Sequence, residues 1–318
     1  MEEIKVIEFF GGIGACTQAF KRIGIPFKVV DYVEINQNAV KSYNAINDTN
    51  YEPQDISKWD KDMQVDFIMH GSPCQDFSMA GKQAGGDKGS ETRSSLMYET
   101  IRIVKKLQPK YVLWENVENL LSDKHIHNYN NYLNTLSELG YTNYHKVLNS
   151  SDYGVPQSRN RIFTLSILGD VKFEFPKEQY LEKTLYDLLE PEYDVKQVVL
   201  TDNDLKMVKD FGAPYSFGGF VVKGNLYPTI TASYGKVSGN SGKIMCKEGF
   251  RILTPRESWR MMGFTDENYD KASKVNEASA LYHQAGNSIV VDVIEAILAS
   301  LFNIQQDKHY RQQQKKLF

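Results

Sequence analysis

The first half of the chain alternates between strand-like and helix-like segments, and this alternation constrains the fold more than any other feature. Helical periodicity covers Ser94–Leu107 and Tyr129–Leu139, each between two short apolar runs. The apolar runs predict strands at Ile4–Phe9, Phe27–Val33, Val65–His70, Tyr111–Trp114, Tyr144–Leu148 and Arg161–Ile167. Strands that alternate with helices predict an α/β fold, a doubly wound and mostly parallel sheet with helices on both faces.

The regular alternation ends near Phe175, and a second, smaller domain is expected beyond it. Shorter elements there are separated by prolines, at Pro176, Pro191, Pro214 and Pro228. Helical segments return at Pro255–Gly263 and Ile289–Phe302. We therefore expect one large domain built from residues 1–173 and 256–318, interrupted by a small irregular domain of residues 174–255.

Composition excludes several classes of protein. Hydrophobic residues make up 41% and charged residues 24%, an ordinary globular balance. No apolar run looks long enough to span a bilayer, and the chain starts directly in a strand-like segment. We therefore expect a cytoplasmic protein without a membrane segment or signal peptide. Three widely spaced cysteines argue against a disulfide framework or zinc site, and the pair His125 and His127 matches no metal motif, so no metal is expected.

Charge changes sign within the expected small domain. The net charge of −3 and the pI of about 6.1 give no overall nucleic-acid signal. Between Phe211 and Met262, however, seven basic residues stand against two acidic ones, whereas Val171–Asp210 holds six lysines and ten acids. Eight of the 22 glycines lie between Phe211 and Gly249. Such a stretch can follow DNA phosphates, with Lys236 and Lys243 as candidates; a mobile surface insertion is the alternative.

A glycine-rich turn, "EFFGGIG" (Glu8–Gly14), follows the first strand and opens a helix. Its glycines let a ligand approach the backbone, and the helix N-terminus offers free N–H groups. A dinucleotide fingerprint needs a third glycine, but position 17 is threonine, which counts against a pyrophosphate ligand. Glu34 and Asp55 could hold ribose and adenine, which favours S-adenosylmethionine. A helix cap is the alternative for each acid.

Cys74 stands in "GSPCQDFS" (Gly71–Ser78), just after the third predicted strand. Ligands bind outside the carboxyl ends of parallel strands, so a cysteine there differs from a buried, inert one. "ENV" (Glu115–Val117) ends the next strand at the same edge, and "QSRNR" (Gln157–Arg161) opens the last one, with its two arginines on one side of the strand. A cysteine, an acid and two arginines together fit covalent chemistry on an electron-poor ring.

Together these segments resemble the cytosine-C5 DNA methyltransferases of bacteria and phages. They follow the family's order: "FFGGIG", Glu34, Asp55–Ile56, "GSPCQDFS", "ENV", "DYGVPQSRNRIF", "RILTPRESWRMMGF" and "QAGNSIVVDV". The resemblance covers about Ile4–Ile167 and Arg251–Ile297. It implies a Rossmann-like, class I methyltransferase domain that binds S-adenosylmethionine, with residues 174–255 as a target-recognition domain.

The resemblance also assigns roles to single residues. Cys74 would attack C6 of a cytosine flipped out of duplex DNA, which activates C5 for the methyl group. Glu115 would hold N3 and the exocyclic amine, and Arg161 would hold O2. Arg159 would support the loop or the developing charge. Gln75 would assist from a loop that closes over the DNA.

Two sets of binding residues are implied in the same way. The cofactor would contact Phe10, Gly12, Ile13, Gly14, Glu34, Ile35, Asp55, Ile56, Gly71, Pro73, Leu96, Asn287, Ser288 and Ile289. The DNA would contact Ser78, Lys82, Thr229, Thr231, Lys236 and Lys243.

Three other functions stay open on the sequence. A tRNA cytosine methyltransferase uses the same scaffold, although "DFSMAGKQAGG" after Pro-Cys-Gln resembles the DNA enzymes. A non-catalytic DNA-binding module would keep the fold, but every chemical residue is present. A nucleotide-dependent oxidoreductase is opposed by the missing third glycine and by "PCQ". We expect a monomer; a companion restriction endonuclease, if one exists, would act separately.

Overall fold

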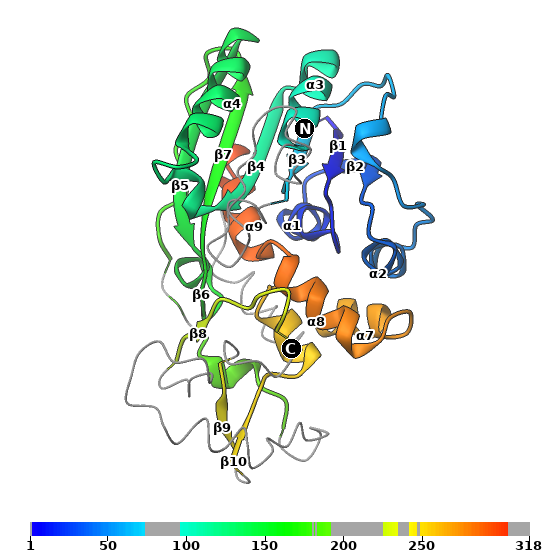
Figure 1. Cartoon of the computed structure of the whole chain (residues 1–318), viewed down its shortest axis with the longest axis vertical. Coiled ribbons are helices and arrows are strands. Elements are labelled where there is room, and N and C mark those ends of the chain that lie inside the picture. The colour runs from blue at the N-terminus through cyan, green and yellow to red at the C-terminus, as the bar shows by residue number, and fades with distance from the viewer. Residues whose placement is uncertain are drawn as a thin grey trace.

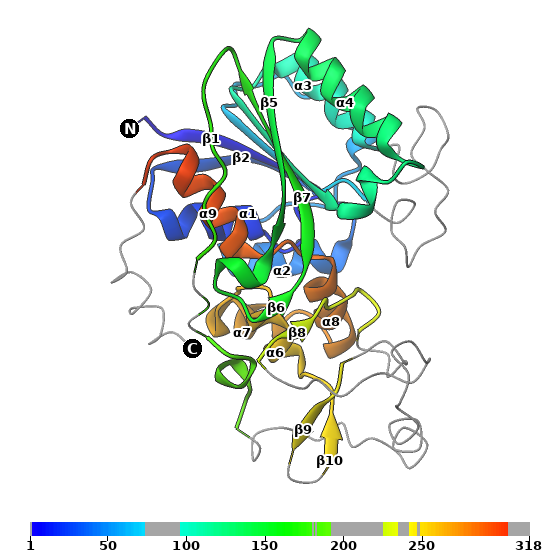
Figure 2. The same cartoon turned by 90° about the vertical axis from the view of Figure 1, so that its left-hand side faces the viewer.

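A six-stranded sheet forms the centre of the larger part of the molecule (Figures 1 and 2). The computed structural model describes residues 2–73, 96–179, 181, 183–191, 225–234, 242–246 and 249–304. The strands are β1 (Ile4–Phe9), β2 (Phe27–Val33), β3 (Phe67–His70), β4 (Tyr111–Val117), β5 (Tyr141–Asn149) and β7 (Asn160–Leu168). Their order is β2-β1-β3-β4-β7-β5. Strands β1 to β4 pair in parallel, whereas β7 runs antiparallel between β4 and β5.

Helices cover both faces of the sheet, which confirms the predicted doubly wound α/β fold. Helices α1 (Ala15–Ile23) and α9 (Val291–Leu301) lie on one face, and α3 (Met97–Leu107) and α4 (Ile126–Glu138) lie on the other (Figure 2). Side chains of β3 alternate between the two cores: Phe67 and Met69 join the first, and Ile68 joins the second. A strand buried on both faces reads as a continuous apolar run, which is why the sequence revealed it.

Three helices lie below the sheet in Figure 1, together with the described part of residues 174–255, called the variable region below. They are α6 (Pro255–Arg260), α7 (Asp266–Ser273) and α8 (Ala278–Asn287). Helix α2 (Gln37–Asn47) follows β2, and short 3-10 turns occur at η1 (Ile56–Lys58), η3 (Glu118–Leu121), η4 (Ser150–Tyr153) and η5 (Leu185–Leu188). The short strands β6 (Gln157–Ser158) and β8 (Tyr227–Pro228) pair in parallel, and β9 (Ile244–Cys246) pairs with β10 (Gly249–Arg251) antiparallel.

A separate apolar core joins the variable region to the helices below the sheet. Its buried members are Leu185, Leu188, Tyr227, Ile230, Tyr234, Ile244, Ile252, Leu253, Met261 and Tyr282. Most come from within residues 174–255, but Met261 follows α6 and Tyr282 belongs to α8. The burial of Tyr227 and Tyr234 shows that these tyrosines serve packing.

One stretch within the described residues, Ala278–Leu301, is long and apolar enough to cross a membrane by length and composition alone. The sequence had been expected to hold no run of that length. The stretch contains α8, a break at residues 288–290 and α9. Two thirds of its most apolar window is buried inside the protein (67%), and core helices meet the same length and composition test. This burial favours its reading as part of the core.

Arg22 fastens α1 to α9 and to the turn after α6. Its guanidinium lies 3.2 Å from both Asp292 Oδ2 and Glu295 Oε2, and it donates to the Gly263 carbonyl oxygen. The arginine side chain is only 10% exposed. Arg22→Met should therefore lower the free energy of unfolding by about 3 kcal/mol, because two largely buried carboxylates lose their counter-charge.

Urea unfolding measures this effect, and Lys271→Met is the matched control. Lys271 also lies between two carboxylates, Asp48 and Glu267, but these are 85% and 76% exposed. Loss of an exposed pair should cost less than about 1 kcal/mol. Equal losses in the two variants would contradict a special role for the buried cluster.

Candidate active site and cofactor pocket

The carboxyl ends of the parallel strands bring the candidate site residues to one edge of the sheet. The glycine turn follows β1, Glu34 follows β2, Gly71 follows β3, and Glu115 lies near the end of β4. Strand β7 is antiparallel, so its first residues meet the end of β4, with Arg161 paired opposite Val117. This reversal puts the start of one strand at the edge where the other strands end.

Glu115 and Arg161 form a largely buried ion pair at this edge. Arg161 Nε lies 3.0 Å from Glu115 Oε1, and Glu115 is 8% exposed. Burial raises the pKa of Glu115, while the positive charges of Arg161 and Arg159 partly oppose this shift. Both positive charges therefore act on the same carboxyl group, whereas the sequence predicted only that the two arginines lie on one side of the strand. Burial and the two positive charges therefore act in opposite directions on the protonation of this carboxyl group.

Gly71 and Ile289, two further residues of the predicted site, lie next to this ion pair. A methyl group at Gly71 would lie 3.7 Å from Glu115 Oε2 and 3.3 Å from Ile289 Cδ1. The segment that carries Cys74 thus begins beside the acid and beside the segment that precedes α9. Cys74, Gln75, Ser78 and Lys82 themselves lie outside the described residues.

Strand β4 also anchors the segment before Cys74, through contacts that sequence reasoning missed. Trp114 Nε1 donates to Ser72 Oγ at 3.0 Å, and Asn116 Nδ2 donates to the Ser72 carbonyl oxygen at 3.3 Å. Ser72 and Asn116 are 3% and 2% exposed. The signal for this anchor was the asparagine of "ENV", which was quoted as part of a motif but given no role.

The glycine turn after β1 adopts a conformation that leaves room for a ligand. Phe10 and Gly12 both have φ of +53°, and Gly14 has φ of +86° where it caps α1. A methyl group at Gly12 would meet no other atom within 4 Å in the described structure. Gly12 is therefore required by its backbone conformation and not by crowding, and the space above it is open.

Glu34 closes the glycine turn from the second strand. Its Oε2 accepts from the Gly12 N–H at 3.2 Å, and its Oε1 accepts from the Asn36 N–H at 2.8 Å. Burial raises the pKa of this carboxyl group. Next to it, Ile35 is 69% exposed, unusual for a large apolar side chain, so an acid and an apolar surface stand side by side.

Asp55 makes the contact expected of a helix cap. Its Oδ1 accepts from both the backbone N–H and the hydroxyl of Ser57 at the start of η1, and these bonds lower its pKa. The helix-cap role, which the sequence left open for Asp55, is therefore the one that this oxygen fills. Ile56 is buried behind it.

Two stacked tyrosines support the glycine turn from below, and the sequence gave no signal for them. Tyr32 and Tyr43 stack with ring centroids 3.7 Å apart. A methyl group at Gly11 would lie 2.7 Å from the Tyr32 ring, and one at Gly14 would lie 2.8 Å from the Tyr43 ring. Tyr32 also donates to the Gly12 carbonyl oxygen at 2.6 Å. These two rings therefore limit how closely the glycine turn can approach β2 and α2.

Glu8 lies buried beneath the turn and explains the threonine at position 17. Glu8 is 1% exposed and accepts hydrogen bonds from the hydroxyls of Thr17 and Tyr43. Burial raises its pKa to about 7. Thr17, which replaces the third glycine of a dinucleotide fingerprint, thus serves a buried acid.

The remaining cofactor candidates lie at or near the same edge. Leu96 precedes α3 and Pro73 follows the β3 segment, both partly buried. Ser288 is buried, and the exposed Asn287 donates through Nδ2 to His283 Nε2 at 2.8 Å. A pocket of about 370 Å³ lies beside them, lined by Asn36, Asn38, Ala232, Ser233, Ser279, Ala280, His283 and Gln284.

The expected DNA contacts of the variable region differ in position. Thr231 is exposed, and Thr229 Oγ1 donates to the Ser158 carbonyl oxygen at 2.8 Å. Lys243 is only 1% exposed, which does not suit a side chain that must reach phosphates. Lys236 lies outside the described residues.

Several of the basic residues between Phe211 and Met262 are paired with acidic side chains, so fewer of them can contact DNA phosphates than the count implied. Arg251 is buried and paired with Glu257 at 2.7 Å. Arg256 contacts Glu190 and Asp270, and Arg260 binds Asp266. The positive charge of this segment is therefore partly neutralised by acidic partners. Glu257 lies within the same stretch, whereas Glu190, Asp266 and Asp270 lie outside it.

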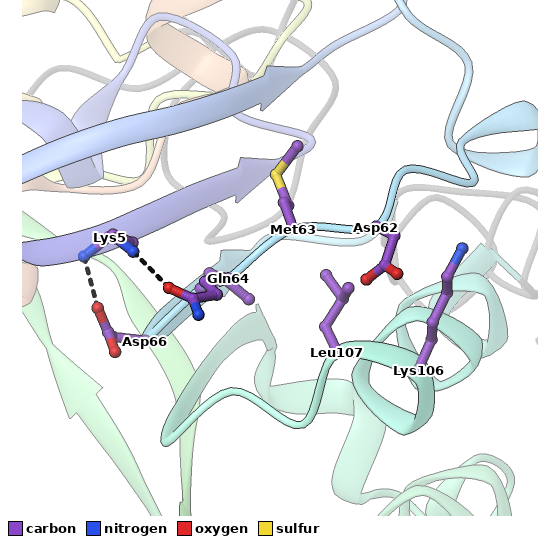
Figure 3. Close-up of a pocket in the computed structure, with 8 residues that line it drawn as sticks. Lys5, Asp62, Met63, Gln64, Asp66, Lys106 and Leu107 are labelled. Atoms are coloured by element: carbon purple, nitrogen blue, oxygen red, sulfur yellow. Dashed lines mark hydrogen bonds between the residues drawn. The ribbon is translucent and has the colours of Figure 1, made fainter.

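A second depression lies at the opposite edge of the sheet and does not belong to this site. Its volume is about 480 Å³, and Figure 3 shows Lys5, Gln64 and Asp66 linked by hydrogen bonds on one side. Lys106 and Leu107, at the end of α3, line the other side. Among the described residues, no group of three or more His, Cys, Asp or Glu side chains could hold a metal ion.

Comparison with solved structures defines the class of fold. An Entamoeba histolytica methyltransferase has a TM-score of 0.78 at 20% identity, covering 96% of this chain and all of that chain. The S. pombe Dnmt2 methyltransferase has a TM-score of 0.74 at 22% identity over similar shares, 96% and 100%. With the sheet order and the glycine turn, this likeness defines a class I methyltransferase fold.

Sequence comparison then gives the family. Residues 4–303 match the model of the C-5 cytosine-specific DNA methylases. The type II methyltransferase M2.ScrFI of Lactococcus lactis subsp. cremoris is 33% identical, over 95% of this chain and all of its own length. The type II methyltransferase M.HhaI of Haemophilus parahaemolyticus is 34% identical over 77% of this chain and 78% of its own length. The chain belongs to the C-5 cytosine-specific DNA methylase family and is a DNA (cytosine-5-)-methyltransferase.

The burial of Glu8 should make stability depend on pH. Its pKa is about 7 in the folded protein against 4.5 as the reference, so the folded state holds the proton more tightly. Stability should then fall as pH rises from about 4.5 through 7, and Glu8→Gln should remove this contribution. Between pH 5 and pH 8, the loss of unfolding free energy should be about 2 kcal/mol smaller in Glu8→Gln than in wild type.

Urea unfolding at several pH values tests this. Glu277→Gln, a change at an exposed carboxylate, is the control and should keep the wild-type pH profile. The same slope in wild type and Glu8→Gln would show that Glu8 does not titrate in this range.

Proposed function

We propose that the protein transfers a methyl group from S-adenosylmethionine to C5 of a cytosine flipped out of duplex DNA, within one short recognised sequence. We further propose that the reaction passes through a covalent bond between Cys74 and C6. The observation that carries this proposal is the Glu115–Arg161 pair, 3.0 Å apart, beside Gly71 at the start of the segment that holds Cys74.

The protein residues would activate the cytosine in the following way. The Cys74 thiolate bonds to C6, and the electron pair of the C5=C6 double bond moves toward C5. Glu115 donates a hydrogen bond or proton to N3, and its raised pKa suits that role. Arg161 holds O2. After C5 is methylated it loses its proton to a base, the double bond re-forms and the Cys74–C6 bond breaks.

The edge of the sheet suits S-adenosylmethionine, which supplies a methyl group on a sulfonium sulfur when bound. The open space above Gly12 admits the ligand close to the backbone. The Glu34 carboxylate lies where ribose hydroxyls would bind, and the exposed Ile35 offers an apolar surface for the adenine ring. On the other side, Gly71, Ser288 and Ile289 would enclose the methionine portion.

The same proposal extends to the rest of the molecule. Residues 174–255 would form the target-recognition domain, with Thr229 and Thr231 as contacts to DNA. The enzyme would act as a monomer in the cytoplasm without a metal ion, and a companion restriction endonuclease would act separately.

Methylation mapping tests the reaction and substrate together. DNA incubated with the purified protein and S-adenosylmethionine should carry 5-methylcytosine in one short sequence, detected by sequencing that distinguishes methylated cytosine. Cys74→Ala should leave the DNA unmethylated. Methyl transfer to RNA, with none to DNA, would overturn the DNA substrate but keep the chemistry.

Trapping on 5-fluorocytosine tests the covalent step. Fluorine at C5 cannot leave as a proton does, so the adduct should stall and survive a denaturing gel. A duplex with the mapped sequence and 5-fluorocytosine at the target should trap the wild-type protein but not Cys74→Ser. Cys16→Ser is the matched control, because Cys16 is buried in α1, 2% exposed, and should leave trapping intact. Methylation by Cys74→Ser at the wild-type rate would refute the nucleophile assignment.

A further inference from the structure

Arg159 is buried between three segments of the chain. Its side chain is 4% exposed. Nη1 donates to the Ile230 carbonyl oxygen at 2.9 Å, and Nη2 donates to the carbonyl oxygens of Ser288 at 2.9 Å and Gly286 at 3.3 Å. Backbone carbonyls therefore accept from both terminal nitrogens of the guanidinium, which does not suit a group that binds substrate directly.

The carbonyls that Arg159 holds belong to the two binding segments. Ile230 lies between Thr229 and Thr231, the proposed DNA contacts. Ser288 lies between Asn287 and Ile289, and all three are proposed cofactor contacts. One guanidinium thus joins the middle of one segment to the middle of the other, although 58 positions separate these residues in the sequence.

Gln157 holds the backbone of Ile230 through its N–H group. Its Oε1 accepts from the Ile230 N–H at 3.1 Å, and its Nε2 donates to the Met261 carbonyl oxygen at 2.7 Å. Gln157 is fully buried. The backbone N–H and C=O of Ile230 are therefore both bound to side chains of "QSR", and the two peptide groups that flank this residue have little freedom to move alone.

The two binding segments also touch each other directly. A methyl group at Gly286 would lie 2.2 Å from the Thr231 carbonyl carbon, so only glycine lets the backbones approach this closely. His283 Nδ1 lies 3.1 Å from the Ala232 carbonyl oxygen. A displacement of residues 229–232 must therefore be transmitted to residues 286–288 or open this contact.

We propose that Arg159 is a positioning residue that couples DNA recognition to cofactor binding, by joining the Ile230 and Ser288 carbonyls through one guanidinium. This inference rests on the proposed function and adds to it. DNA that orders residues 229–231 also orders the cofactor segment, so each ligand strengthens the binding of the other. Such coupling is reciprocal, and it can be lost while both separate affinities remain.

The test measures the affinity of S-adenosylhomocysteine with and without a saturating duplex that carries the mapped target sequence. In wild type the duplex should tighten cofactor binding by about tenfold, a typical coupling. Arg159→Lys keeps the charge but cannot reach three carbonyls in a fixed plane, so the tightening should fall to about twofold. Binding of S-adenosylhomocysteine without DNA should change less than about threefold.

Arg260→Lys is the matched control. Arg260 is also largely buried and donates to a backbone carbonyl, that of Leu188, as well as to Asp266. It does not contact either binding segment in the described structure, so this variant should lose stability but keep the wild-type coupling. Wild-type coupling in Arg159→Lys would overturn the inference, and so would equal loss in both variants.

Hydrogen exchange of the wild-type protein gives a second test that needs no variant. Added alone, S-adenosylhomocysteine should slow exchange of the amides at residues 229–232, which are not proposed cofactor contacts. Protection confined to the cofactor segments would overturn the coupling but leave the proposed methylation intact. Failure of the proposed function would appear instead as no methylation of any DNA by wild type.

Discussion

The antiparallel insertion of β7 between β4 and β5 is the constraint on which the site depends. The four neighbouring parallel strands can present only their carboxyl ends at this edge. Because β7 runs the other way, it begins there, with Arg161 opposite Val117 and near Glu115. In a fully parallel sheet these arginines would lie at the far edge. The ion pair, the Arg159 contacts and the β6–β8 pairing all follow from this reversal.

Much of this arrangement could be predicted from the sequence, for reasons that differ between residues. Strands β1 and β2 match their predicted bounds because short runs rich in β-branched and aromatic residues mark strands. The candidate site residues could be proposed because short motifs follow strand ends. The direction of each strand could not be predicted from the sequence, because antiparallel and parallel strands share the same two-residue period. The separate tasks of Arg159 and Arg161 were hidden too, because spacing cannot tell a guanidinium that faces a carboxylate from one that faces carbonyls.

The charges counted in the sequence were a poor guide to the charges on the folded surface. Lys243 and Arg251 counted as positive surface, yet both are buried, and Arg251 is bound to Glu257. Conversely, Glu8, Glu34 and Glu115 are carboxyl groups whose pKa values burial raises, and all lie at or beneath one edge of the sheet. Desolvation of three acids costs folding free energy. Their gathering at one place makes this edge a candidate functional site independently of any motif.

The variable region shares its apolar core with residues outside it, which limits how residues 174–255 could be exchanged between related proteins. Met261 and Tyr282 pack among the variable-region residues, and Tyr282 donates to the Leu253 carbonyl oxygen at 2.8 Å. A segment cut at residues 174 and 255 and moved into a relative would carry most of this core. Met261 and Tyr282 would stay behind. A chimaera would therefore have an incompletely matched apolar core, unless Met261 and Tyr282 were transferred as well.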